Sequence, residues 1–346
     1  MKNIKVLGID LAKNVFQLHG TDTNGKCVIR KRLSRSALIE FLVNLPSCLI
    51  GIEACTGAHY WARNFEQMGH KVKMMAPQFV KPYVRSNKND RNDARAIAEA
   101  VTRPEMKFVP IKKIEQQDTL LLHRARSLVI KQRTAQANQI RGLLAEYGII
   151  IPKGITHLKK LAEILDYNKE KLTEKSYAVF TKLNEQFKVY NTEVSAYDKQ
   201  IEMMANANVM CREIMKIEGI GPLTASATVA TIGDAKVFKN GREVSAWLGL
   251  VPKQHSSGNT IRLSGISKRG DNYVRMLLIH GARSVVKTCE QKTDRKNTWV
   301  SNKKNNCGFN KAAVALANKN ARVIWAILAT GESYRNPGNF RELSDK

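Results

Sequence analysis

Residues 4–10 read IKVLGID, a short apolar run that ends in an aspartate. A run of this length predicts a strand, because a helix needs a longer apolar pattern. Two more strands are predicted at residues 15–21 and 27–33, since Asn24-Gly25 between them is a hairpin signal. The three segments together predict a meander of strands at the start of the chain.

The pattern then alternates between helix and strand up to about residue 107. We expect a helix at residues 36–45, a strand at 48–53, a helix at 59–68, a strand at 70–75 and a helix that begins near Asp90 and ends before Pro104. A meander of three strands followed by such an alternation is the order of a ribonuclease-H-like fold. Residues 1–107 are therefore predicted to form an α/β domain of that type.

Long helical patterns replace this alternation in residues 108–209, where glycine and proline are rare. An earlier helical segment, at about 116–147, carries Leu122, Val129 and Leu143 on one face. A later apolar ladder with spacings of three and four residues predicts a heptad seam, and so a coiled coil. The ladder consists of Phe180, Leu183, Phe187, Tyr190, Val194, Tyr197, Ile201 and Met204. These patterns fit an antiparallel hairpin or dimerisation arm, and equally a bundle packed within one chain.

Residues 210–346 form the third predicted region, which we expect to be mostly helical and which is richer in glycine and basic residues. The whole chain has 57 Lys and Arg against 30 Asp and Glu, a formal net charge of +27. Such an excess favours a polyanionic partner, because each phosphate that is neutralised releases condensed counterions. A ribosome-associated protein, a heparin-binding protein or a basic enzyme is the alternative, and nucleic acid is the favoured partner.

The six cysteines form no C-x-x-C pair, which argues against a zinc finger or a redox motif. A long basic chain of this kind is typical of a reducing compartment. We recognise no signal peptide, and no apolar run approaches the roughly 20 residues needed to cross a bilayer. We therefore expect a cytoplasmic protein without a membrane partner.

Four acids stand where metal-dependent nuclease chemistry needs them. Asp10 and Glu53 each end a predicted strand, and Asp90 and Asp93 lie three residues apart where a helix begins. Carboxylate oxygens are preferred ligands of Mg²⁺, and two such ions can stabilise the entering and leaving oxygens at phosphorus. Each acid alone has a simpler explanation, as a turn residue or a helix cap. The four together predict a Mg²⁺ site.

A glycine motif opens the third region, IEGIGPLTA at residues 217–225. It predicts a helix, a tight turn through Gly219 and Gly221, and a new helix, as in a helix-hairpin-helix element. Free amides at the start of the second helix can bind a DNA phosphate. The alternative is a plain turn between two helices.

A polar segment with two serines follows, VPKQHSSG at residues 251–258, which we expect to be a loop. A serine hydroxyl becomes a nucleophile only when a metal or a base activates it, and most loop serines are structural. Basic residues downstream are candidate contacts to a nucleic-acid backbone, with a solvated basic face as the alternative for each. These are Lys268, Arg269, Arg275 and Arg283.

Taken together, the motifs resemble those of the DEDD transposases of bacterial insertion sequences, which are related to the Piv-type DNA invertases. The segment from Glu218 to Arg275 is similar to their C-terminal transposase domain, with Ser257-Gly258 in the expected order. The acid set is similar to their RuvC-like motif and consists of Asp10, Glu53, Asp90 and Asp93. The resemblance covers nearly the whole chain. It implies a RuvC-like first domain, a coiled-coil middle and a mostly helical transposase domain with a serine loop.

The resemblance also implies a mechanism. Members of the family are recombinases guided by a bridge RNA, in which one loop pairs with target DNA and another with donor DNA. They work as oligomers, dimers or tetramers, in which the acidic domain of one subunit meets the serine loop of another. By this resemblance Ser257 attacks the phosphate to form a phosphoserine link, and the four acids hold Mg²⁺. The residues alone leave the adjacent Ser256 open as the nucleophile.

Two other functions fit the same residues. A structure-specific endonuclease of the Holliday-junction type would use the acids and the glycine turn, but water would attack the phosphate. A nucleic-acid-binding protein without catalysis would use the acids only structurally. A covalent protein–DNA intermediate separates the transposase from the endonuclease, and metal-dependent cleavage excludes the binding protein.

Overall fold

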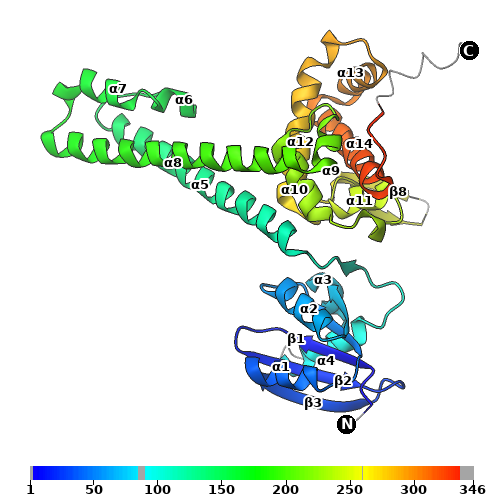
Figure 1. Ribbon diagram of the computed structural model, residues 1–346. Coiled ribbons are helices and arrows are strands. Elements are labelled where there is room, and N and C mark those ends of the chain that lie inside the picture. The colour runs from blue at the N-terminus through cyan, green and yellow to red at the C-terminus, as the bar shows by residue number, and fades with distance from the viewer. Residues whose placement is uncertain (1–2, 85–89, 259, 336–346) are drawn as a thin grey trace, which may run out of the picture. The chain divides into compact units, whose positions relative to one another are not determined.

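The computed structural model describes residues 3–84, 90–258 and 260–335 (Figure 1). The chain divides into two compact units, Met1–Lys113 and Ile114–Lys346. Within the described ranges, no helix combines the length and the apolar composition needed to cross a membrane. The further division of the second unit at residue 209 stays a prediction.

The first unit is a mixed α/β domain built on one six-stranded sheet, which confirms the predicted α/β class. Its strands lie in the order β3-β2-β1-β4-β5-β6. Strands β1, β2 and β3 form the predicted antiparallel meander, β4 and β5 run parallel to β1, and β6 is an antiparallel edge strand. Their bounds are Val6–Asp10, Val15–Thr21, Cys27–Ser34, Leu49–Glu53, Lys71–Met75 and Phe108–Val109.

Helices cover both faces of this sheet. Leu7 and Ile9 of β1 pack into a core shared with α1 and α2, whereas Gly8 between them faces α4. The alternation follows from the period of two along a strand. The helices are α1 (Arg35–Val43), α2 (Ala58–Gln67), α3 (Pro77–Val80) and α4 (Asp90–Ala100), with a short 3-10 turn at Lys81–Tyr83.

Two long helices form an arm in the second unit, α5 (Ile114–Ala145) and α8 (Glu174–Ala207) (Figure 1). They run antiparallel, because Arg133 donates to Asn191 while Gln136, further along α5, donates to the earlier Leu183 carbonyl. The heptad seam of α8 thus packs against α5 of the same chain. The four seam residues that follow one another at intervals of seven positions are buried. These residues are Phe180, Phe187, Val194 and Ile201.

The connection between the two arm helices contains α6 (Ile155–Leu158) and α7 (Leu161–Tyr167), which add to the core at that end. One detail of the arm differs from expectation. Leu143 was expected on the same face as Val129, but it is 42% exposed, whereas the adjacent Leu144 is completely buried. A helix that follows its partner over many turns shifts its buried face gradually, and sequence spacing alone misses that shift by one residue.

The remainder of the second unit is mostly helical, as predicted, around one continuous core. Its helices are α9 (Val209–Met215), α10 (Pro222–Ile232), α11 (Gly241–Trp247), α12 (Asn272–Thr288), α13 (Arg295–Cys307) and α14 (Phe309–Thr330). Between α11 and α12 the chain forms a two-stranded antiparallel hairpin, β7 (Pro252–Ser257) and β8 (Thr260–Ile266). The segment expected to be a loop is therefore a hairpin, with a shift of register between Pro252 and Gln254.

A buried histidine joins the arm to this helical core. His123 of α5 lies between the Tyr273 hydroxyl of α12 and the Ser226 hydroxyl of α10, each 3.0 Å from a ring nitrogen. Ser226 donates its own proton to the Pro222 carbonyl, so it accepts from Nε2–H, and Nδ1 accepts from Tyr273. Burial, and then the charge of Arg126, lower the pKa of His123 to about 4, so the imidazole is neutral near pH 7.

Candidate functional site

Two of the four predicted acids lie at one edge of the sheet. Asp10 is the last residue of β1 and Glu53 is the last residue of β4. These strands are parallel neighbours in which Ile9 pairs with Ile52, so the residue that follows each is an acid. The carboxyl ends of adjacent parallel strands are where ligands bind in open α/β sheets. The fold thus brings Asp10 and Glu53 to the same edge.

The negative charge at this edge of the sheet affects the pKa of the Cys55 thiol. Burial, and after it the carboxylates of Glu53 and Asp10, raise the pKa of this thiol. Both carboxylates act on one group, so their negative charge is concentrated in one place. A concentration of negative charge attracts a cation.

Helix α4 rests directly on the strands that carry these acids. Gly8 and Gly51 are register partners on β1 and β4. A Cβ atom on Gly8 would lie 2.2 Å from the carbonyl oxygen of Ala94 and 2.5 Å from the amide nitrogen of Ala98. Only glycine permits such a close approach of helix and strand. The contact at Ala94 joins the first turn of α4, in which Asp93 precedes Ala94, to the middle of β1.

Asp90 and Asp93 both belong to this first turn. Asp90 begins α4 as predicted, but its side chain is outside the described residues. Asp93 is half-buried. Among the described side chains, no three from His, Cys, Asp and Glu are placed to hold a metal ion. The donor chemistry still fits a hard divalent cation, because Asp10, Glu53 and Asp93 offer only carboxylate oxygens.

Gly8→Ala is expected to lower the free energy of unfolding of the first unit by about 1–3 kcal/mol or more, because backbone atoms of α4 cannot move aside as a side chain can. Urea unfolding followed by circular dichroism measures the loss. Gly142→Ala is the matched control: it lies in helix α5 with open space around it, so an added methyl group is expected to be neutral or to stabilise by up to about 1 kcal/mol. Equal unfolding midpoints for Gly8→Ala and the parent protein would contradict the close packing.

The predicted glycine turn lies between α9 and α10. Gly219 has a φ of +87° and packs against Gly281 of α12, whose carbonyl oxygen would lie 2.7 Å from a Cβ on Gly219. Gly221 caps the start of α10, is surrounded by open space and precedes Pro222, which has no amide hydrogen. Gly219 therefore serves close packing of two helices, whereas a Cβ atom on Gly221 would meet open space.

Glu218, beside this turn, is held by residues that sequence reasoning did not connect with it. It accepts hydrogen bonds from Lys292 and, at 3.1 Å, from Asn297, and the buried Lys296 lies 3.7 Å away. Burial opposes ionisation, but these hydrogen bonds and charges lower the pKa of Glu218 overall. Its partners follow more than 70 residues later, so no local pattern could have revealed the cluster.

Ser257 lies at the tip of the hairpin. It is the last residue of β7, pairs with Thr260 of β8 and precedes Gly258, whose φ of +55° allows the reversal. The side chain is exposed, and none of the described residues forms a hydrogen bond with its hydroxyl. The Ser256 hydroxyl instead accepts from Gln254 Nε2 at 2.9 Å.

The predicted basic contacts lie at the base of the hairpin and differ in exposure. Lys268 and Arg269 are exposed, and Lys268 has a φ of 54°, which is uncommon for a residue with a side chain. Arg275 is only 6% exposed, and its guanidinium donates to the carbonyls of Leu248 and Arg269 at 3.0 and 2.8 Å. This burial does not favour the prediction that Arg275 contacts a phosphate. The Arg275 side chain instead links the backbone segments at the base of the hairpin.

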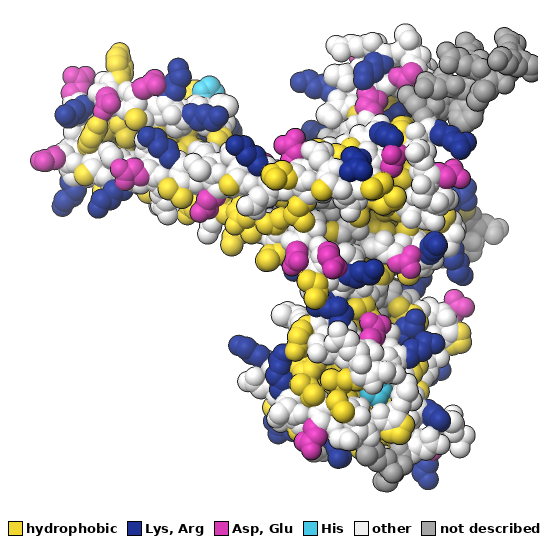
Figure 2. All heavy atoms as spheres, in the orientation of Figure 1, with side chains coloured by type: hydrophobic (Ala, Val, Ile, Leu, Met, Phe, Trp, Pro, Cys, Tyr) yellow, Lys and Arg dark blue, Asp and Glu magenta, His cyan; other side chains and the backbone are white. Residues whose placement is uncertain are grey.

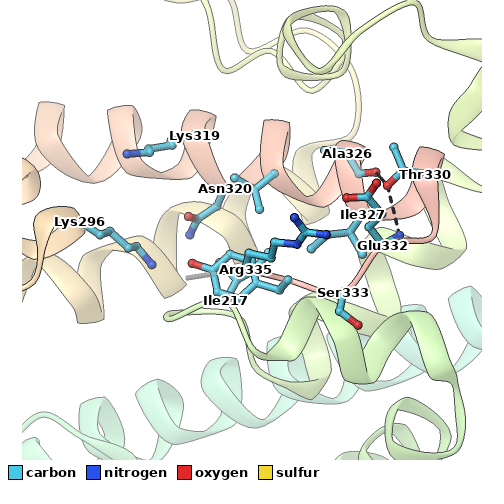
Figure 3. A pocket seen from close by; sticks show the side chains of 12 residues that line it. Ile217, Lys296, Lys319, Asn320, Ala326, Ile327, Thr330, Glu332, Ser333 and Arg335 are labelled. Carbon is cyan, nitrogen blue, oxygen red and sulfur yellow. Dashed lines mark hydrogen bonds between the residues drawn. The ribbon is translucent and has the colours of Figure 1, made fainter. Parts of the chain in front are cut away.

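A pocket of about 230 Å³ lies elsewhere in the second unit, between α13, α14 and the segment that follows α14 (Figure 3). Lys296, Lys319 and Arg335 line it together with one acid, Glu332. Of the predicted site residues whose side chains are described, Asp10, Glu53, Asp93, Ser256 and Ser257 are all absent from its wall. The pocket is basic but separate from the predicted catalytic residues.

Two family models match this chain. One described as Transposase, of the DEDD type, matches residues 7–149 and includes the four acids. The other is described as Transposase IS116/IS110/IS902 family and matches residues 211–297, which include the glycine turn and the serine hairpin. Together they cover both regions in which the site residues lie.

Several curated proteins are similar to this chain over most of its length. A probable family 20 transposase of Pseudomonas aeruginosa is 44% identical over 97% of this chain and 100% of its own length. The transposase for insertion sequence element IS1111A of Coxiella burnetii is 44% identical over 97% of this chain and 92% of its own length. A pilin gene-inverting protein of Moraxella lacunata is 23% identical over 79% of this chain and 80% of its own length.

Proposed function

The chain belongs to the IS116/IS110/IS902 family and is a DNA transposase of the insertion-sequence type, and we propose that it cuts and rejoins donor and target DNA through Ser257. The observation that carries this proposal is the position of Ser257, exposed at the tip of a hairpin. The hydroxyl of Ser256 is engaged by Gln254 and is therefore the poorer nucleophile.

Membership of the DEDD family implies dependence on a divalent metal, and Mg²⁺ is the ion that we propose. Asp10, Glu53, Asp90 and Asp93 would hold it. When bound, the ion would supply positive charge that offsets the negative charge developing on the phosphate. The ends of β1 and β4 carry Asp10 and Glu53, and the close packing of Gly8 against Ala94 of α4 supports a shared site by joining the first turn of α4 to β1. The strand order β3-β2-β1-β4-β5 supports the RuvC-like fold that the family implies.

The acids and the serine belong to different units of the chain. A site that uses both must therefore be assembled from two units, and we propose that these come from two subunits of an oligomer. Every seventh residue at the start of α5 is an apolar side chain that is more than half exposed, namely Ile114, Leu121 and Leu128. Figure 2 shows hydrophobic side chains gathered on the arm that α5 and α8 form. A heptad stripe of this kind is suited to pack against a second copy.

We propose that Lys268 and Arg269 contact the nucleic-acid backbone and that Gly221 leaves the start of α10 open to a phosphate. The net charge of +27 favours a partner rich in phosphates, and a guide RNA together with two DNA duplexes would offer many phosphates to neutralise. In such a division of labour, base pairing reads the sequence and the protein reads the backbone.

RNA guidance is tested by strand joining with purified protein, donor and target DNA, Mg²⁺ and RNA transcribed from the end of the element. We expect joined product only when the RNA is present. Changing the target-pairing loop should move the joining site to the new complementary sequence, and an RNA with a scrambled loop is the control. Joining of equal yield without RNA would refute guidance but leave the transposase activity intact.

A further inference from the structure

The hairpin formed by β7 and β8 has one face on which every paired side chain is polar. Successive side chains of a strand point to opposite faces, so His255 and Ser257 of β7 share a face. On β8, Arg262 pairs with His255 and Thr260 pairs with Ser257. All four side chains are exposed. A nucleophile, an imidazole and a guanidinium therefore lie together on one surface.

The opposite face carries Ser256 together with two apolar side chains of β8. Ile261 pairs with Ser256 and Leu263 pairs with Gln254, and both apolar side chains are exposed. Gln254 and Ser256 are joined by a hydrogen bond on this face. The two adjacent serines thus have different neighbours, and of the two only Ser257 shares its face of the hairpin with an imidazole.

The spacing of His255 and Ser257 along β7 suits the transfer of a proton from the serine hydroxyl to the imidazole. On the face that carries Ser256, Gln254 reaches the hydroxyl of the second residue after it at 2.9 Å. His255 and Ser257 have the same separation on the polar face. The imidazole Nε2 lies about as far from its own Cβ as the amide nitrogen of glutamine does, so His255 can approach the Ser257 hydroxyl in the same way.

We propose that His255 is the base that accepts the proton of Ser257 and that Arg262 binds the phosphate which Ser257 attacks. This inference rests on the proposed role of Ser257. The ligand is a DNA phosphodiester, and a planar guanidinium suits its two free oxygens because it can donate two parallel hydrogen bonds.

The step balances without a further reactant. The Ser257 oxygen forms a bond to phosphorus, and the bond from phosphorus to one deoxyribose oxygen breaks. The hydroxyl proton passes to His255, and the leaving deoxyribose oxygen takes a proton from water. In rejoining, a deoxyribose hydroxyl attacks the phosphoserine and Ser257 is released, so the number of phosphodiester bonds is conserved.

The charges that face His255 are all positive. Arg262 lies opposite it on β8, Lys253 precedes it by two residues on β7, and neither strand contains an acid. The polar face of the hairpin therefore suits a negatively charged ligand such as a phosphodiester.

The test measures the rate at which a covalent protein–DNA species forms in the full-length protein with RNA, DNA and Mg²⁺, across pH 5.5 to 8.5. His255→Ala should lower the rate by about 100-fold or more, which is the usual contribution of a general base. It should also remove the rise in rate with pH that an imidazole base produces, and added imidazole should restore part of the rate.

Arg262→Ala should weaken DNA binding, with partial recovery in Arg262→Lys. Gln254→Ala, on the opposite face of the same strand, is the matched control and should stay within about twofold of the parent protein, because removing an exposed hydrogen bond costs little.

Ser257→Ala distinguishes a failure of the proposed function from a failure of the role proposed for His255. A covalent species that persists in Ser257→Ala would overturn the proposed function itself. Loss of the species in Ser257→Ala, combined with an unchanged rate and pH profile in His255→Ala, would overturn only the role of His255. A drop in rate in His255→Ala with an unchanged pH profile and no recovery with imidazole would also overturn it, because that pattern is structural.

Discussion

Ser257→Ala is expected to abolish the covalent protein–DNA species, with a loss of at least about 1,000-fold, because removing a catalytic nucleophile leaves only binding and electrostatic contributions. Ser256→Ala should retain the species. The difference follows from the hairpin, where Ser256 accepts from Gln254 on one face and Ser257 is exposed on the other. A denaturing gel of the complete reaction, with labelled DNA, measures both variants.

The same gel contains the outcome that would contradict a serine nucleophile. Cleaved DNA without attached protein, undiminished in Ser257→Ala, would show that water attacks the phosphate. The protein would then cut DNA as a metal-dependent endonuclease does. Both substitutions replace exposed side chains, so their effect on folding should be within about 0.5 kcal/mol.

Asp10→Asn and Glu53→Gln should each lower DNA cleavage by at least about 100-fold, because each removes a charge that would hold the divalent ion and keeps the size of the side chain. Their position at the ends of adjacent parallel strands is the reason that two single changes should have similar effects. Calorimetric titration with Mg²⁺ provides a readout that is independent of activity, and the affinity should fall with the rate.

Glu40→Gln is the matched control in the same unit. Glu40 is an exposed acid on α1, in a different element from the acid edge, so its loss should change neither cleavage nor metal affinity. Full cleavage in Asp10→Asn would contradict the role of the sheet edge. Reduced cleavage in all three variants would indicate a general effect of charge on DNA binding instead.

Most elements of the first unit follow from local patterns in the sequence. The predicted strand at 15–21 coincides with β2, and the predicted helix at 59–68 differs from α2 by one residue at each end. Short elements were missed, among them α3 and the two-residue β6. An element of two to four residues has no complete period of hydrophobicity, so only its tertiary partners identify it.

The candidate site likewise has features that the sequence predicted and features that only the structure shows. The sequence indicated the acids because each follows a strand or begins a helix, and it singled out Ser257 only through a family resemblance. It offered Arg275 as a candidate contact to a nucleic-acid backbone, whereas in the structure its guanidinium donates to backbone carbonyls. Burial of a charged side chain depends on what packs around it, and charge alone carries no information about that.

Taken alone, the sequence determined the longer strands and helices of the first unit, the heptad seam of α8, the basic charge and the identity of the candidate acids. Each of these is a property of neighbouring residues or of composition. Only the tertiary structure decided that α4 packs closely against Gly8 and Gly51 of the sheet. It also decided that the heptad seam of α8 packs against α5 of the same chain, and that Ser256 and Ser257 lie on opposite faces of a hairpin. Those features join residues far apart in the chain or depend on strand register, which is fixed by pairing between segments and not by either segment alone.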